Sequence, residues 1–171
     1  QDLATTEDIY LKVVRGKTAA LFAAAAKVGG VIAQAPQEHI GSLFEYGDAL
    51  GIAFQIVDDL LDVIGNTDKT GKNVGDDFRE CKLTLPFIKA IAKADDKERA
   101  FWTNTIEKGK QEEGDLETAL NLLNKHGAID ETRRDALEWA KKAQDAIRRL
   151  PQHEIRDLLD DLSVYVIERV N

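Results

Sequence analysis

The 171-residue chain has no methionine, a single cysteine (Cys81) and three prolines. One cysteine cannot form an internal disulfide, and its presence fits a reducing compartment. Apolar runs are short as well: the longest covers residues 19–26 and ends at Lys27, which is too short to cross a bilayer. No charged-then-apolar signal segment opens the chain. Because the first residue is Gln1 and methionine is absent, we expect a piece of a longer polypeptide.

Basic residues are in the minority, with 23 Lys and Arg against 31 Asp and Glu, which gives a net charge of -8. A chain of this charge repels nucleic acid and anionic membrane surfaces. Any phosphate that it binds is therefore expected to be held locally, by metal ions or by a few placed cations. The length and the 43% hydrophobic content are those of one globular domain with a sizeable core.

The three prolines, Pro36, Pro86 and Pro151, stand where one helical pattern ends and another begins. No segment has the alternation of apolar and polar residues that is typical of a strand, and no repeat or linker divides the chain. The sequence therefore predicts an all-α fold, a helix bundle in one domain. The predicted helices cover about residues 6–33 with a break at Gly16, then 37–64, 84 onward, 97–112, 115–126, 130–150 and 152–170, with a loop at 65–75.

The segment FQIVDDLLD, residues 54–62, places Asp58, Asp59 and Asp62 among large apolar side chains. On a helix the three aspartates fall within one arc of about 100°, and the apolar residues occupy the other side. Gly47 and Gly51 extend the carboxylate side along the helix and predict a trough that something can approach closely. Carboxylates crowded on one arc repel one another unless a cation is present. Oxygen donors of this kind suit Mg²⁺ bridged to a phosphate.

A solvated acidic face is the competing interpretation of D-D-x-x-D, and we interpret a similar cluster in RDLLDDL as such a face. That second cluster consists of Asp157, Asp160 and Asp161. Nearby cations distinguish the first aspartate cluster from the second. Lys72 in KTGKNVGDD and Lys82 in CKLTLP follow the first cluster closely, which suits a diphosphate bridged by metal. No such loop follows the second cluster.

Other metal and phosphate motifs fail on their spacing. The loop GNTDKTGKN lacks the four-residue spacing, the Ser or Thr and the preceding strand of a P-loop, and no glutamate closes an EF-hand loop. The three histidines are scattered without ligand spacing, which disfavours zinc. Cys81 has no base at a recognisable spacing, so we predict a packing role for it.

Lys17 and Thr18, in RGKTAALF, stand at the predicted break between two helices. Backbone amides are unpaired at such a break and favour an anion. The alternative is that Lys17 is an ordinary surface lysine and that residues 19–26 serve close helix packing.

Four segments resemble the trans-polyprenyl diphosphate synthases of the long-chain isoprenyl diphosphate synthase family, in the family's order: YLKVVRGKTAALF, YGDALGIAFQIVDDLLD, TGKNVGDDFRECKLTLP and GDLETALNLLNKHGA. The most specific match is GxAFQIxDDxLD followed by GKxxGxD and KxTLP. The resemblance covers nearly the whole chain and implies an isoprenoid synthase fold of antiparallel helices around a deep cavity. It also implies a Mg²⁺-dependent condensation of isopentenyl diphosphate with an allylic diphosphate, in isoprenoid and quinone side-chain biosynthesis, by a cytoplasmic homodimer.

The resemblance implies roles for individual residues. Three match the Mg²⁺ ligands of the family's second aspartate-rich motif: Asp58, Asp59 and Asp62. Three match lysines that contact the diphosphate: Lys17, Lys72 and, less closely, Lys82. Two match polar residues beside the developing carbocation, and an aromatic residue is assigned to the substrate: Thr18, Gln55 and Phe54.

The sequence departs from the family's pattern in two ways. Cys81 stands where the family usually has glycine, so a different backbone is expected beside Lys82. The family's first aspartate-rich motif and the basic residues that hold isopentenyl diphosphate are absent. We therefore interpret residues 1–171 as the carboxy-terminal part of a polyprenyl synthase domain, without its amino-terminal helices. Alone it is expected to be inactive and to need the missing amino-terminal half.

Two other functions stay open. A non-catalytic helical partner subunit would shape a true prenyl synthase through a dimer interface, but degraded carboxylates would be expected in such a subunit. A terpene cyclase shares the acid–metal chemistry, whereas the lysines Lys17 and Lys72 and the motif KLTLP favour the elongating enzyme.

Overall fold

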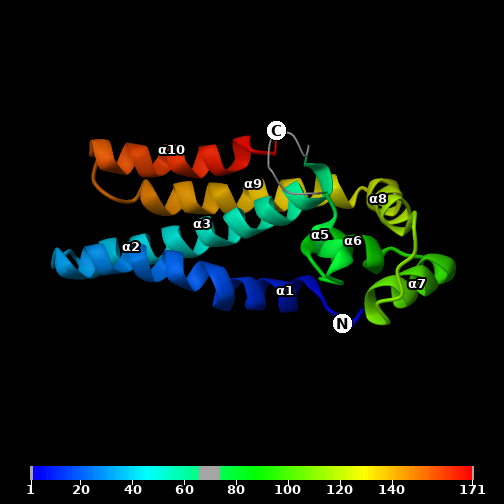
Figure 1. The fold of residues 1–171 in the computed structure, drawn as a ribbon. Helices are drawn as coiled ribbons and strands as arrows, with labels where there is room; N and C mark the ends of the chain where they lie inside the picture. The colour runs from blue at the N-terminus through cyan, green and yellow to red at the C-terminus, as the bar shows by residue number, and fades with distance from the viewer. Residues whose placement is uncertain (1, 66–73, 171) are drawn as a thin grey trace. The chain divides into compact units, whose positions relative to one another are not determined.

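The computed structural model describes residues 2–65 and 74–170. All regular structure in these residues is helical and no strand occurs among them, so the predicted all-α class is confirmed. Two π-helical turns, η1 (Arg15–Ala19) and η2 (Thr103–Glu107), directly follow the helices α1 and α7. The helices, drawn in Figure 1, are α1 (Glu7–Val14), α2 (Ala20–Ile32), α3 (Gln37–Ile64), α5 (Asp76–Arg79), α6 (Leu85–Ala92), α7 (Asp96–Trp102), α8 (Asp115–Lys125), α9 (Ala128–Ile147) and α10 (Glu154–Glu168).

The chain forms two compact units. The first consists of Gln1–Tyr10 and Asp58–Arg133, and the second of Leu11–Val57 and Arg134–Asn171. The boundaries fall inside α1, α3 and α9, so the units are joined by continuous helices.

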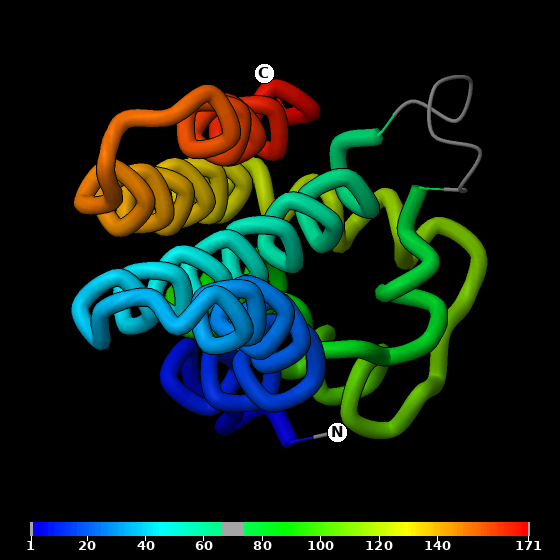
Figure 2. Tube along the Cα trace, turned by 90° about the vertical axis from the view of Figure 1, so that its left-hand side faces the viewer, coloured from blue at the N-terminus to red at the C-terminus, as the bar shows by residue number. Residues whose placement is uncertain are grey.

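In the second unit, α2 packs against α3 at two glycines of α3. A Cβ atom added at Gly47 would lie 2.5 Å from the carbonyl oxygen of Phe22, and one added at Gly51 would lie 2.6 Å from Cα of Ala19. Only glycine permits two helix backbones to approach this closely. The prediction of a trough beside the carboxylates is therefore wrong: the end of η1 and the start of α2 fill the space along these glycines, and Ala19 and Ala23 are buried there. Figures 1 and 2 both show α2 running alongside the first part of α3.

The carboxy-terminal helices complete this unit. α9 and α10 lie side by side in Figures 1 and 2, and the side-chain amide of Gln144 on α9 donates to Asp160 on α10 at 2.9 Å. The buried Tyr46 of α3 donates its hydroxyl hydrogen to the carbonyl of Leu159 on α10 at 2.9 Å. These bonds tie α10 to both of its neighbours.

The first unit has its own hydrophobic core, centred on aromatic rings. The fully buried Trp102 of α7 meets Phe87 of α6 edge to face, with ring centroids 5.9 Å apart. Pro86 stands in the first turn of α6, where its missing N–H costs no helix bond. The buried members of this core are Val63, Phe78, Phe87, Ala90, Ile91, Trp102, Ile106, Ala119, Leu123 and Ala128.

Three local details differ from the sequence prediction. No break occurs at Gly16, because η1 continues the helix from α1 into α2 and Val14 and Ala20 keep right-handed helical backbones. The helix predicted over 97–112 ends at Glu107, and Gly109 then takes the left-handed backbone (φ 64°). The short helix α5 was not predicted. None of the helices formed by residues 2–65 and 74–170 is both long and apolar enough to cross a membrane.

Candidate functional site

The three predicted metal ligands lie on the last two turns of α3, in the first unit. Asp59 and Asp62 are buried, with exposed fractions of 3% and 8%, and Asp58 is partly exposed. Buried carboxylates require hydrogen-bond donors or cations, because desolvation of the charge is costly. Both buried aspartates have donors from segments far away in the sequence.

Asp59 accepts a hydrogen bond from the phenol of Tyr10. The distance from the Tyr10 hydroxyl to Oδ2 of Asp59 is 2.6 Å, and both side chains are buried. Burial, followed by the negative charge of Asp59, raises the pKa of Tyr10 well above its usual range. The phenol therefore keeps its proton and acts as the donor.

Asp62 is held by the start of α5. Its two carboxylate oxygens accept from the backbone amides of Asp76 at 3.0 Å and Asp77 at 3.2 Å, and its carbonyl accepts from the amide of Gly75 at 2.8 Å. Burial, and then the negative charge of Asp77, raise the pKa of Asp62 to about 6, although the two amide bonds oppose this shift. Burial and the neighbouring carboxylate of Asp77 thus both disfavour the charged form of Asp62.

Lys82 approaches the same acidic region through Asp77. Its Nζ lies 3.2 Å from Asp77 Oδ1 and 2.6 Å from Glu80 Oε2, and half of its side chain is exposed. These contacts raise the pKa of Lys82, with the Glu80 bond as the largest cause. A partly exposed lysine paired with two acids is a cation that can change partners when a stronger anion arrives.

The backbone before Lys82 takes the conformation that glycine favours. Cys81 has a left-handed φ of 55°. Its amide donates to the carbonyl of Phe78, and the Lys82 amide donates to that of Asp77. These two bonds form a Schellman motif at the end of α5, with Cys81 at the position where glycine is usual. The expectation of a different backbone beside Lys82 is therefore wrong, because cysteine adopts the left-handed geometry at some cost in strain. The partly buried Cys81 Sγ is 3.4 Å from the side-chain amide of Gln111, which fits the predicted packing role.

The other predicted residues that the structure describes belong to the second unit. Thr18 lies in η1 and donates its hydroxyl hydrogen to Oε1 of Gln55 on α3 at 3.0 Å. Phe54 packs against Phe22 with ring centroids 5.6 Å apart. Lys17 is exposed and is also part of η1. Because the helix is continuous here, the predicted helix N-terminus with unpaired amides is absent; a π-helical turn, a feature frequent at functional sites, takes its place.

Lys72, which the sequence predicts to contact the diphosphate, lies outside the described residues. Among residues 2–65 and 74–170, no three acidic, histidine or cysteine side chains converge as a preformed metal cage. Mg²⁺ does not need such a cage, since it keeps several waters and binds through one or two carboxylates plus phosphate oxygens. The carboxylate oxygens of Asp58, Asp59 and Asp62 on α3 are the kind of donor that fits this mode of binding.

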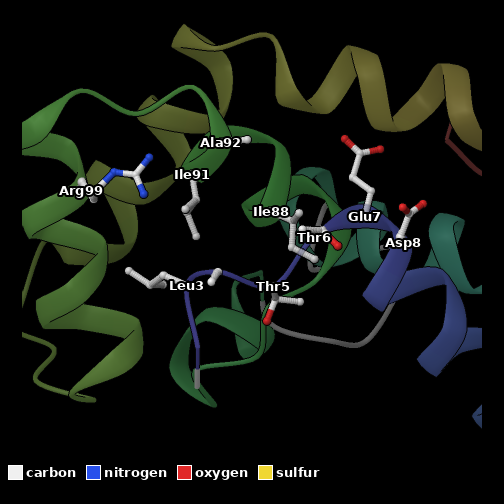
Figure 3. Close-up of a pocket in the computed structure, with 10 residues that line it drawn as sticks. Leu3, Thr5, Thr6, Glu7, Asp8, Ile88, Ile91, Ala92 and Arg99 are labelled. Carbon is white, nitrogen blue, oxygen red and sulfur yellow. The ribbon is translucent and has the colours of Figure 1, made fainter.

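The sequence did not single out Tyr10 and Asp77. Tyr10 lies seven residues before Lys17, two helical turns away, and Asp77 is the last aspartate of GDD. A pocket of about 400 Å³ in the first unit is lined by Leu3, Ile88, Ile91 and Arg99 among others (Figure 3), but none of the predicted site residues lines it.

Comparison with known proteins identifies the family. The model of the polyprenyl synthetase family matches residues 1–123. The chain belongs to the polyprenyl synthetase family. It is 37% identical over 168 residues to the octaprenyl diphosphate synthase of Haemophilus influenzae, covering 98% of this chain and 51% of that protein. It is 38% identical over 164 residues to the octaprenyl diphosphate synthase of Escherichia coli, covering 96% and 50%.

Solved structures of the family have the same fold. A decaprenyl diphosphate synthase from Rhodobacter capsulatus superposes with a TM-score of 0.94 at 60% identity, covering 99% of this chain and 52% of that one. A polyprenyl synthase from Caulobacter crescentus, in complex with calcium and isoprenyl diphosphate, has a TM-score of 0.92 at 40% identity, covering 99% and 52%. The isoprenoid synthase type of fold is thus confirmed. The chain spans about half the length of the relatives it matches.

Proposed function

We propose that this chain supplies the second aspartate-rich half of a polyprenyl diphosphate synthase, which joins isopentenyl diphosphate to an allylic diphosphate. The observation that carries the proposal is the acidic cluster of α3, where Asp59 and Asp62 are buried in a member of the polyprenyl synthetase family. Buried carboxylates close to one another favour a cation. The motif resemblance makes that cation Mg²⁺ and its partner a diphosphate.

Asp58, Asp59 and Asp62 would hold the Mg²⁺ in this proposal. The amides that bind Asp62 and the phenol that binds Asp59 keep two of these carboxylates in place. When bound, Mg²⁺ would neutralise the charge that develops on the diphosphate as it leaves. Because the carboxylates are already held in place, they would not have to rearrange as the diphosphate leaves, and this preorganisation would lower the barrier to its departure.

The remaining residues receive roles in the same reaction. Lys17 and Lys72 would pair with the allylic diphosphate, and Lys82 would exchange Asp77 for it. The hydroxyl of Thr18 is oriented by Gln55, so this pair would present fixed dipoles near the positive charge of the allylic carbon. The isopentenyl double bond then attacks that carbon, a carbon–carbon bond forms, and the proton that is lost goes to the departing diphosphate.

We extend the proposal to synthesis of quinone side chains and to a homodimer, on the resemblance alone. The chain is further proposed to be the carboxy-terminal part of its domain and to need an amino-terminal half with the first aspartate-rich motif. A non-catalytic partner subunit is less well supported. Such a subunit has no need of three aspartates on one helical arc, or of the donors that hold two of them.

The test is incorporation of labelled isopentenyl diphosphate into prenyl products. The 171-residue chain is assayed first alone and then mixed with a separately produced amino-terminal half of a relative. We expect no elongation by the chain alone and elongation by the mixture, because the reaction needs carboxylates from both halves. A mixture with the variant Asp58→Asn serves as the negative control.

Two outcomes would contradict the proposal. Elongation by the chain alone would show that the amino-terminal half is not needed. A mixture whose halves are folded and elute together but do not elongate would assign the chain to the non-catalytic class.

A further inference from the structure

The contact between Tyr10 and Asp59 joins two segments that are 49 residues apart in the sequence. Tyr10 belongs to α1 and Asp59 to α3, and both are in the first unit. Tyr10 is 7% exposed and Asp59 is 3% exposed, so the bond is shielded from water. Its oxygen–oxygen distance of 2.6 Å is that of a strong hydrogen bond to a charged acceptor.

The two buried aspartates of α3 are held by donors of different kinds. Asp62 is held by backbone amides at the start of α5, which no side-chain substitution removes. Asp59 is held by a side chain, whose donor group is a single hydroxyl at the end of a rigid ring. A carboxylate offers about four lone-pair sites, and the phenol occupies one of them on Oδ2. Once this bond restricts rotation of the Asp59 side chain, the remaining lone pairs of its carboxylate point in fixed directions.

We propose that Tyr10 is a positioning residue for Asp59, because its phenol holds Oδ2 of this carboxylate and so restricts the rotamer in which Asp59 meets a divalent cation. This inference rests on the proposed function, in which Asp59 is a metal ligand. The role resembles that of the hydrogen-bond partners that orient ligands at metal sites in general. Their removal typically weakens metal binding about 10–100-fold.

The variant Tyr10→Phe tests the inference because it removes the hydroxyl and keeps the ring. The measurement is the affinity of the full 171-residue chain for Mn²⁺, a spectroscopic substitute for Mg²⁺, in the presence of inorganic diphosphate. Electron paramagnetic resonance counts free and bound Mn²⁺ directly, without any assay of activity. We expect Tyr10→Phe to bind Mn²⁺ about 10–100-fold more weakly than the wild type.

The chain offers a matched control. Tyr46 is as buried as Tyr10, at 3% exposure, and its hydroxyl is also hydrogen-bonded, but to the carbonyl of Leu159. Tyr46→Phe therefore makes the same chemical change at a hydroxyl whose acceptor is a backbone carbonyl and not a proposed metal ligand. We expect its Mn²⁺ affinity to equal that of the wild type, even if both variants lose similar stability.

A double-mutant cycle separates positioning from a general effect on the fold. If Tyr10 acts through Asp59, Tyr10→Phe should change Mn²⁺ affinity little in an Asp59→Asn background. An undiminished effect in that background would overturn the inference. So would a Tyr10→Phe variant that binds Mn²⁺ as well as the wild type, while the proposed function would stand. A wild-type chain that binds no Mn²⁺ with diphosphate would instead refute the metal role of Asp59, and the positioning role with it.

Discussion

The chain contains two clusters of three aspartates whose sequences are alike and whose surroundings are opposite. On α3, Asp59 and Asp62 are buried, and their donors include a neutral phenol and two backbone amides. On α10, Asp160 is partly exposed and accepts hydrogen bonds from Gln144 and from the guanidinium of Arg148, at 2.9 and 2.8 Å.

The difference lies in how each cluster is neutralised. On α10, Arg148 neutralises Asp160. A guanidinium nitrogen of Arg156 lies 2.7 Å from Oδ1 of Asp157, another aspartate of the same cluster.

Asp62 itself has backbone amides as donors, and after burial the charge of Asp77 contributes to its raised pKa. The nearby cation Lys82 pairs with Asp77 at 3.2 Å. A cluster paired with arginines has little affinity left for a cation, whereas buried carboxylates close to one another attract one. The distinction between a metal site and a solvated face therefore depends on partners.

Substitution within each cluster should give the largest contrast. In the assembled synthase, we expect Asp58→Asn to lower turnover about 10²–10³-fold, as loss of one electrostatic stabiliser of a developing charge does. Asp160→Asn should leave turnover within about 2-fold and cost about 0.2–1 kcal/mol of the free energy of unfolding, as for an exposed ion pair. Steady-state elongation and thermal unfolding measure the two effects. Equal losses of turnover would remove the functional distinction between the clusters.

Substitution of Lys17, the lysine assigned to the diphosphate, is expected to lower turnover somewhat less. Lys17→Ala should lower turnover by about 10²-fold, because its charge matters mainly as the leaving group develops its own. Its side chain is exposed, so the free energy of unfolding should change by less than about 0.5 kcal/mol. Lys12, exposed on α1, provides the control Lys12→Ala, which should change neither quantity. A variant Lys17→Ala that unfolds but retains normal turnover in its folded fraction would make this lysine structural.

A third buried carboxylate, that of Glu98, has a pKa shifted in the opposite direction from that of Asp62. Glu98 is 8% exposed and accepts hydrogen bonds from Lys125 at 2.5 Å and His126 at 2.8 Å. The Lys125 bond is the largest cause that lowers the pKa of Glu98 to about 2, opposite in sign to the shift of Asp62. The ionised form of Glu98 is thus favoured by folding. Its contribution to stability is present above the usual glutamate pKa, near 4.5, and is lost as the pH falls toward 2.

Glu98→Gln should therefore flatten the loss of stability between about pH 4.5 and pH 2. Urea unfolding at several pH values measures this, with Glu117→Gln on the exposed face of α8 as the control. If wild type and Glu98→Gln lose stability in parallel over this range, the ion pair with Lys125 does not act in solution.

Much of the fold was accessible from local patterns. α3 was predicted from Pro36 to Ile64, and the structure has it at Gln37–Ile64, because proline and helical periodicity act within a few residues. The missing break at Gly16 shows the limit of this reasoning, since glycine weakens a helix by only about 1 kcal/mol and packing overrides it. The short α5 escaped prediction for a related reason. Its N-cap is Gly75, which has a left-handed φ of 86° and lies so close to Leu116 that an added Cβ would clash with it, and both features depend on the surrounding unit.

Residue patterns alone predict a helical chain with three aspartates on one arc of one helix, and its motifs match those of the polyprenyl synthetase family. Helical periodicity and motif spacing are local properties, so no tertiary information is needed to read them. Tertiary packing was needed to show that η1 and α2 fill the space along Gly47 and Gly51, and that Tyr10 and the start of α5 hold two of the carboxylates. Desolvation and hydrogen bonding depend on groups brought from distant parts of the chain, and one aspartate cluster is therefore buried while the other is paired with arginine.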